Sequence, residues 1–158
     1  MTPTPQLTPY TCALACLESY FSDINQPHSQ CEMLKNHYRL LENPDPERRH
    51  EYGAATDAQI IGLCTHLGFV AGLYQDFRQP EVEKAFTGAL ATNAGVLIPA
   101  FWKRTTHHCV RLTQVKSPGL YEVMCPLFHH DAQFEDVTFP NLVSWGFRFI
   151  IITQSGSL

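Results

Sequence analysis

The stretch QLTPYTCALACL, residues 6–17, places a glutamine, Gln6, six positions before a cysteine, Cys12, that opens an apolar run. Thr11 is a favourable residue for capping a helix, so we expect a helix to begin at Cys12. Apolar side chains then recur with helical spacing at Leu14, Leu17, Tyr20 and Phe21. The unpaired N–H groups and the dipole at the start of a helix favour a thiolate. Cys12 is therefore a candidate nucleophile with a lowered pKa.

A candidate general base lies far downstream, at the start of the strand-like run His108-Cys-Val-Arg-Leu112. The turn signal Ser117-Pro-Gly119 follows, and residues 120–124 would return as the second strand of a hairpin. A nucleophilic cysteine needs a base and hydrogen-bond donors for the oxyanion. The layout of these residues can supply both.

Composition favours one globular domain spanning residues 1–158. The chain is 44% hydrophobic and 16% charged, with a net charge of −4 and no basic cluster, which argues against nucleic-acid binding. Its longest apolar candidate, residues 147–153, is too short to cross a bilayer, and the start of the chain shows no standard secretory signal. We therefore expect a cytoplasmic protein with six free cysteine thiols, and export by a specialised secretion system stays open.

The order of the expected elements indicates an α+β fold, with N-terminal helices packed on an antiparallel sheet. Helices are expected at residues 12–21, 29–41, 57–67 and 80–90, and a polar loop at residues 42–52. Strands are expected mainly in the second half, at residues 69–74, 96–101, 108–115, 120–124, 134–139 and 147–153.

Five of these features, taken in order, resemble the papain-like cysteine peptidases that remove leader peptides after a double glycine. They are Gln6 to Leu17, the helix ending in Leu-Gly-Phe69, the apolar strand of residues 96–100, the run HCVRLTQVKSPGLYEVMCP of residues 108–126, and the Trp145-Gly146 step into the last strand. The resemblance covers nearly the whole chain. It implies a bacterial, papain-like thiol protease that acts on a peptide or protein substrate without a cofactor or a metal.

The resemblance also assigns the candidate site. It makes Cys12 the nucleophile and His108 the base, and it places the Gln6 side chain beside the Cys12 backbone N–H in the oxyanion hole. The sequence departs from the family at Ala13, where glycine is usual, and at Cys125-Pro126, where an Asp-Pro step normally supplies the carboxylate that orients the histidine. Either Cys125 serves weakly, or Asp131 or another acceptor replaces it, or activity is low.

Other interpretations stay open. The acyl-thioester chemistry fits peptide cleavage, glutamine deamidation and acyl transfer equally, and a degenerate domain that only binds peptides is the main alternative. His107 competes with His108 as the base. A metal site or a redox role is conceivable, because several potential ligands surround the hairpin: His107, His108, Cys109, Cys125, His129, His130 and Asp131. Their spacing matches no strong zinc motif.

Overall fold

A computed structural model describes residues 3–8, 11–54, 56–75, 78–126 and 132–154. Its centre is a six-stranded sheet with the order β1-β6-β2-β3-β4-β5, in which every neighbouring pair is antiparallel. The strands are β1 (Phe69–Tyr74), β2 (Gly95–Trp102), β3 (Thr106–Ser117), β4 (Leu120–Cys125), β5 (Gln133–Thr138) and β6 (Phe149–Gln154). The helices are α1 (Cys12–Asp23), α2 (Gln30–Leu40), α3 (Asp57–His66), α4 (Gln79–Ala91) and α5 (Phe139–Ser144), with a 3-10 helix at Pro46–Glu51.

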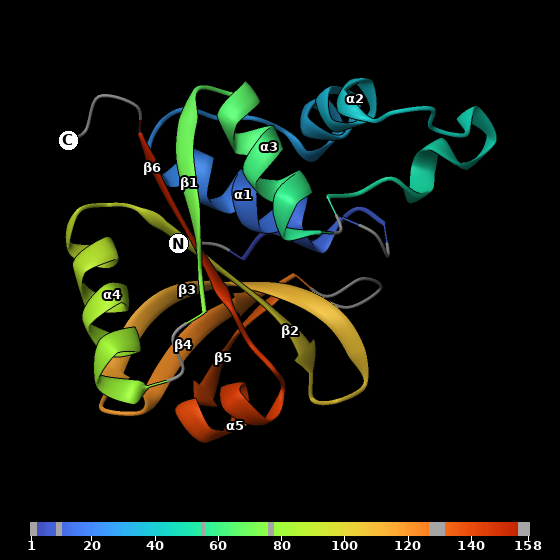
Figure 1. The fold of residues 1–158 in the computed structure, drawn as a ribbon. Helices are drawn as coiled ribbons and strands as arrows, with labels where there is room; N and C mark the ends of the chain where they lie inside the picture. Colours follow the sequence, from blue (N-terminus) through green and yellow to red (C-terminus); the bar gives the residue numbers. More distant parts are fainter. Residues whose placement is uncertain (1–2, 9–10, 55, 76–77, 127–131, 155–158) are drawn as a thin grey trace.

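The predicted α+β class is confirmed, and Figure 1 shows how the helices divide around the sheet. Helices α1, α2 and α3 gather on one side, whereas α4 and α5 lie on the other. Side chains along β3 alternate between the two faces of the sheet. Val110 and Leu112 join the apolar cluster on the face that α4 and α5 cover. Cys109, the residue before Val110, joins the cluster with α1 on the other face.

Local signals in the sequence account for most helix boundaries. Ser29 accepts a hydrogen bond from the backbone N–H of Glu32 at the start of α2. Thr56 and Gln59 form a complete capping box at the start of α3. No helix in these described ranges is long and apolar enough to cross a membrane.

Two local predictions were wrong. The segment 42–52 is not all loop, since a 3-10 helix runs from Pro46 to Glu51, with Asp45 as its cap. Residue Phe139 does not end a strand but begins α5, because Thr138 caps that helix and Pro140 lies in its first turn. The aromatic side chain of Phe139 had suggested a strand, but it packs against Phe147 with the ring centroids 5.9 Å apart.

Candidate active site

Cys12 is the first residue of α1, as the sequence predicts. Thr11 occupies the cap position, but its hydroxyl does not cap the helix; it exchanges hydrogen bonds with the backbone of Thr8 instead. The N–H groups at the start of the helix therefore stay available. The backbone N–H groups of Cys12, Ala13 and Cys109 are directed at the Cys12 sulfur, where they favour a thiolate.

Burial has a larger effect on the pKa of Cys12 than these hydrogen-bond donors have. It raises the pKa of Cys12 to about 12, and the neighbouring Cys109 thiol adds to the increase. The expectation of a lowered pKa, based on the helix N-terminus alone, was therefore wrong for the free protein. Cys16, one turn along α1, is fully buried and donates to the backbone carbonyl of Cys109 across 3.4 Å. This thiol belongs to the packing of α1 on β3.

His108 lies near the start of β3 and lines the same pocket as Cys12. Its Nε2 atom lies 3.3 Å from the Cys125 sulfur at the end of β4. Two irregularities in the pairing of β3 with β4 shift the register toward this contact. Burial lowers the pKa of His108 to about 4. Burial also raises the pKa of Cys125 to about 12, so that side chain is a neutral thiol at neutral pH. Asp131, the other suggested partner, lies outside the described residues.

Gln6 is buried, with 8% of its surface exposed, although it belongs to an extended segment. Gln30 of α2 fixes this segment by accepting a hydrogen bond from the N–H of Leu7 and donating one to the carbonyl of Pro5. The Gln6 amide donates to the carbonyl of Thr8 across 2.9 Å. Gln6 does not line the pocket that Cys12 and His108 share. Its place in the oxyanion hole thus stays a prediction.

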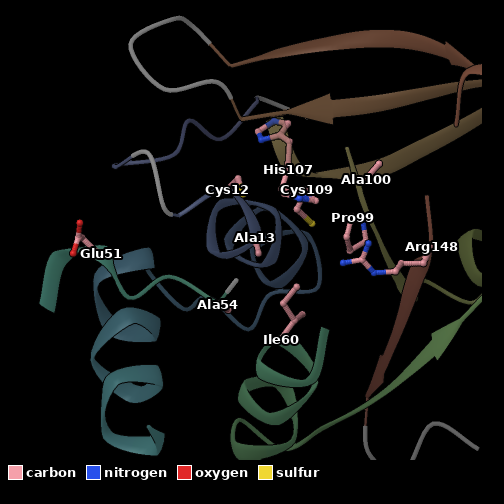
Figure 2. Close-up of a pocket in the computed structure, with 11 residues that line it drawn as sticks. Cys12, Ala13, Glu51, Ala54, Ile60, Pro99, Ala100, His107, Cys109 and Arg148 are labelled. Carbon is pink, nitrogen blue, oxygen red and sulfur yellow. The ribbon is translucent and has the colours of Figure 1, made fainter. Parts of the chain in front are cut away.

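The pocket beside Cys12 has a volume of about 200 Å³ and small, mostly apolar walls. Figure 2 shows the lining residues around the start of α1, from β2, from β3, from α3 and from the segments just before α3 and β6. Its lining residues are Cys12, Ala13, Glu51, Ala54, Ile60, Pro99, Ala100, His107, His108, Cys109 and Arg148. Sequence reasoning found the cysteine and the histidines but missed Arg148 and the small residues, because only the folded sheet brings their segments together.

His107, an exposed residue near the start of β3, also lines the pocket. Its ring packs against Phe101 of β2, with the centroids 5.2 Å apart, whereas His108 has the contact with Cys125. Within the described ranges, no group of three or more His, Cys, Asp or Glu side chains is arranged to hold a metal. The suggested ligands His129, His130 and Asp131 lie outside those ranges.

Comparison with known proteins identifies the fold. The sequence matches no protein-family model and no curated protein. In contrast, the structure matches the peptidase domain of Streptococcus ComA, a bi-functional ABC transporter involved in a quorum-sensing pathway, with a TM-score of 0.63 and 12% identity over 98% of both chains.

The chain has a papain-like peptidase fold. A second similar structure is a double glycine motif protease from an AMS/PCAT transporter in complex with its leader peptide. That match has a TM-score of 0.60 and 14% identity, and it covers 98% of this chain and 93% of the other. The predicted fold is thereby confirmed, with the helix that carries Cys12 packed against the strand that carries His108.

Proposed function

We propose that this chain is a cysteine hydrolase that cleaves a peptide or amide bond through an acyl-thioester on Cys12. The observation that supports the proposal is the pocket that Cys12, the first residue of α1, and His108 both line on a papain-like fold. Three backbone N–H groups around the Cys12 sulfur favour its thiolate form, which is the form that attacks a carbonyl.

The free site rests as a neutral pair. The pKa of Cys12 is far above that of His108, so the proton stays on the thiol until a substrate carbonyl is in place. Cys125 engages Nε2 of the imidazole, which leaves Nδ1 to take the thiol proton as the sulfur attacks. His108 then returns the proton to the leaving amine, and water hydrolyses the thioester. In this mechanism, Gln6 and the N–H of Cys12 hold the oxyanion.

The substrate class is a peptide or a protein, by analogy with the leader peptide that occupies one of the similar structures. Proteolysis, glutamine deamidation and acyl transfer share the same thioester, and they differ only in the group that leaves and the group that accepts the acyl chain. Peptide cleavage is the activity we favour, because both similar structures are peptidase domains.

A test that needs no knowledge of the substrate uses p-nitrophenyl acetate. Attack by Cys12 transfers the acetyl group to sulfur and releases p-nitrophenolate, so the proposal predicts a stoichiometric burst and an acetylated Cys12 peptide. The burst should disappear in Cys12→Ala and fall by about 10² or more in His108→Ala, since general-base catalysis contributes about that factor. Cys31→Ser is the matched control, because Cys31 is the exposed thiol on α2. A burst that survives Cys12→Ala would refute the proposal.

The second candidate is a catalytically degenerate module that binds peptides with the same pocket. The neutral Cys125 thiol at the position of the orienting carboxylate, together with the raised pKa of Cys12, favours it. Such a module would retain peptides but show no burst beyond that of Cys12→Ala. The redox alternative would instead require a reversible disulfide in the purified protein, which non-reducing mass spectrometry detects.

A further inference from the structure

The pocket beside Cys12 ends in a positive charge, although its walls are mostly small and apolar. Arg148 lies just before β6, and Figure 2 shows its guanidinium reaching toward the pocket past Pro99. The backbone N–H of Arg148 donates to the carbonyl of Pro99 across 3.2 Å, which fixes the residue against β2. Its side chain is 30% exposed, so it is held largely out of water.

Asp57 orients the guanidinium of Arg148. The carboxylate accepts a hydrogen bond from Nε of Arg148, and the capping box at Thr56 fixes the start of the helix from which Asp57 projects. Within the described residues, this contact uses only the Nε edge of the guanidinium. The two terminal nitrogens remain for a further acceptor, and they form the part of a guanidinium that binds a carboxylate through two parallel hydrogen bonds.

The lining also determines the sign of the charge that the pocket accepts. Two side chains of opposite charge line the pocket, Arg148 and Glu51, whereas Asp57 does not line it. The Glu51 carboxylate accepts a hydrogen bond from Nε of Arg48, so Arg148 is the lining charge that an entering carboxylate can pair with. The neighbouring walls, which include Ala13, Ala54 and Ile60, offer little polar competition and keep the local dielectric low. A lysine side chain would meet the like charge of Arg148, and a neutral side chain would desolvate the terminal nitrogens of the guanidinium without giving them an acceptor.

We propose that Arg148 is a specificity-determining residue that selects substrates with a carboxylate in this pocket. This proposal rests on the proposed function and names a substrate class for it. The carboxylate would come either from an Asp or Glu side chain near the scissile bond or from the C-terminus of the substrate. Asp57 acts as the positioning residue that holds the guanidinium in place.

The test is peptide binding by the full chain with Cys12→Ser, which prevents turnover. A positional-scanning library of acetylated hexapeptides, made with both amidated and free C-termini, is retained on immobilised protein and read by mass spectrometry. Three proteins are compared in the Cys12→Ser background: the parent, which keeps Arg148, and the variants Arg148→Gln and Arg148→Lys. Arg39→Gln is the control, because it changes the net charge equally at an exposed residue of α2 that does not line the pocket.

The proposal predicts enrichment of Asp and Glu over Asn and Gln by about tenfold at one position, since a charge-assisted hydrogen bond discriminates by at least that factor. Enrichment in the amidated set identifies a side-chain carboxylate, and enrichment confined to free C-termini identifies a terminal one. Either preference should vanish in Arg148→Gln, fall in Arg148→Lys and persist in Arg39→Gln. An unchanged profile in Arg148→Gln, or no acidic preference at all, would overturn the proposal.

The two proposals fail separately in these experiments. If Cys12 is acylated by p-nitrophenyl acetate but no acidic preference appears, only the role of Arg148 is refuted. If Cys12 is not acylated but the acidic preference depends on Arg148, the hydrolase proposal is refuted. The role of Arg148 then holds for a domain that binds peptides without cleaving them. Circular dichroism melting of Arg148→Gln checks that loss of the Asp57 contact has not unfolded the domain.

Discussion

The Nε2 atom of His108 lies 3.3 Å from the sulfur of Cys125, so a thiol occupies the place from which a carboxylate would orient the imidazole. A carboxylate stabilises the imidazolium that forms during catalysis, whereas a neutral thiol contributes little to that charge. Burial lowers the pKa of His108, and the contact with a neutral thiol supplies no negative charge that would raise it.

Replacing that thiol should strengthen the site. Cys125→Asp puts a negative charge beside His108, and we expect it to raise the pKa of the imidazole and to increase the acylation rate with p-nitrophenyl acetate by at least about tenfold. Cys125→Asn provides an acceptor of similar size without the charge and should give a smaller gain. Because Cys125 is 1% exposed, circular dichroism must show that the variants fold. A folded Cys125→Asp protein with an unchanged rate would contradict the role assigned to His108.

The pKa of His108 gives a second prediction. Burial lowers it to about 4, so the ring binds a proton only below that pH in the folded protein but near pH 6.5 in the unfolded chain. The unfolded state therefore binds more protons between these values, and the folded state loses stability as the pH falls from about 6.5 toward 4. NMR titration of the His108 ring measures this pKa directly. A value near 6.5 would show that the imidazole is solvated.

The oxyanion role of Gln6 predicts a kinetic effect without a large change in binding. Removing one oxyanion donor reduces turnover by about 10²–10³, so Gln6→Ala should slow acylation of Cys12 by a similar factor. Gln30→Ala releases the segment around Gln6 without removing its amide, and we expect an intermediate loss. Equal rates in Gln6→Ala and the wild type would remove Gln6 from the mechanism.

The position of α1 against the sheet depends on Gly95. A Cβ at this residue of β2 would lie 2.8 Å from the ring of Tyr20, whose hydroxyl contacts the carbonyls of Asn93 and Ile152. Gly95→Ala should therefore destabilise the fold by about 1–3 kcal/mol, as overpacking of a core does.

Gly88 provides the control for that experiment, because a Cβ there would meet no atom within 4 Å on α4. Gly88→Ala should leave the free energy of unfolding unchanged or raise it by up to about 1 kcal/mol, since alanine favours a helix. Urea denaturation measures both variants. Equal stability of the two variants would show that Tyr20 can move aside.

Local signals explain why much of the fold was predictable. Residues 69–74 form β1 as expected, and the caps at Ser29 and Thr56 begin their helices. The turn after Ser117 pairs β3 with β4 as expected, although two irregularities inside the hairpin shift the register toward the contact of His108 with Cys125. Each of these features depends on residues that are neighbours along the chain or across one turn.

The properties of the site depend on packing and were not predictable in the same way. The start of a helix indicates a lowered pKa for Cys12, but burial against β3 reverses the direction. Arg148 and Asp57 are 91 positions apart, and no sequence pattern connects them. The α5 helix did have a local signal, the cap at Thr138 before Pro140, which the aromatic Phe139 obscured.

The pH dependence of Cys12 alkylation by iodoacetamide shows whether His108 activates Cys12. Peptide mass spectrometry follows Cys12 in the wild type and in His108→Ala, with the exposed Cys31 as an internal reference. If His108 is the base, the Cys12 rate is nearly constant from about pH 5 to 8 and falls by at least about tenfold in His108→Ala. A rate that instead rises about tenfold per pH unit in both proteins, as ionisation of an unassisted thiol requires, would show that His108 is not the base.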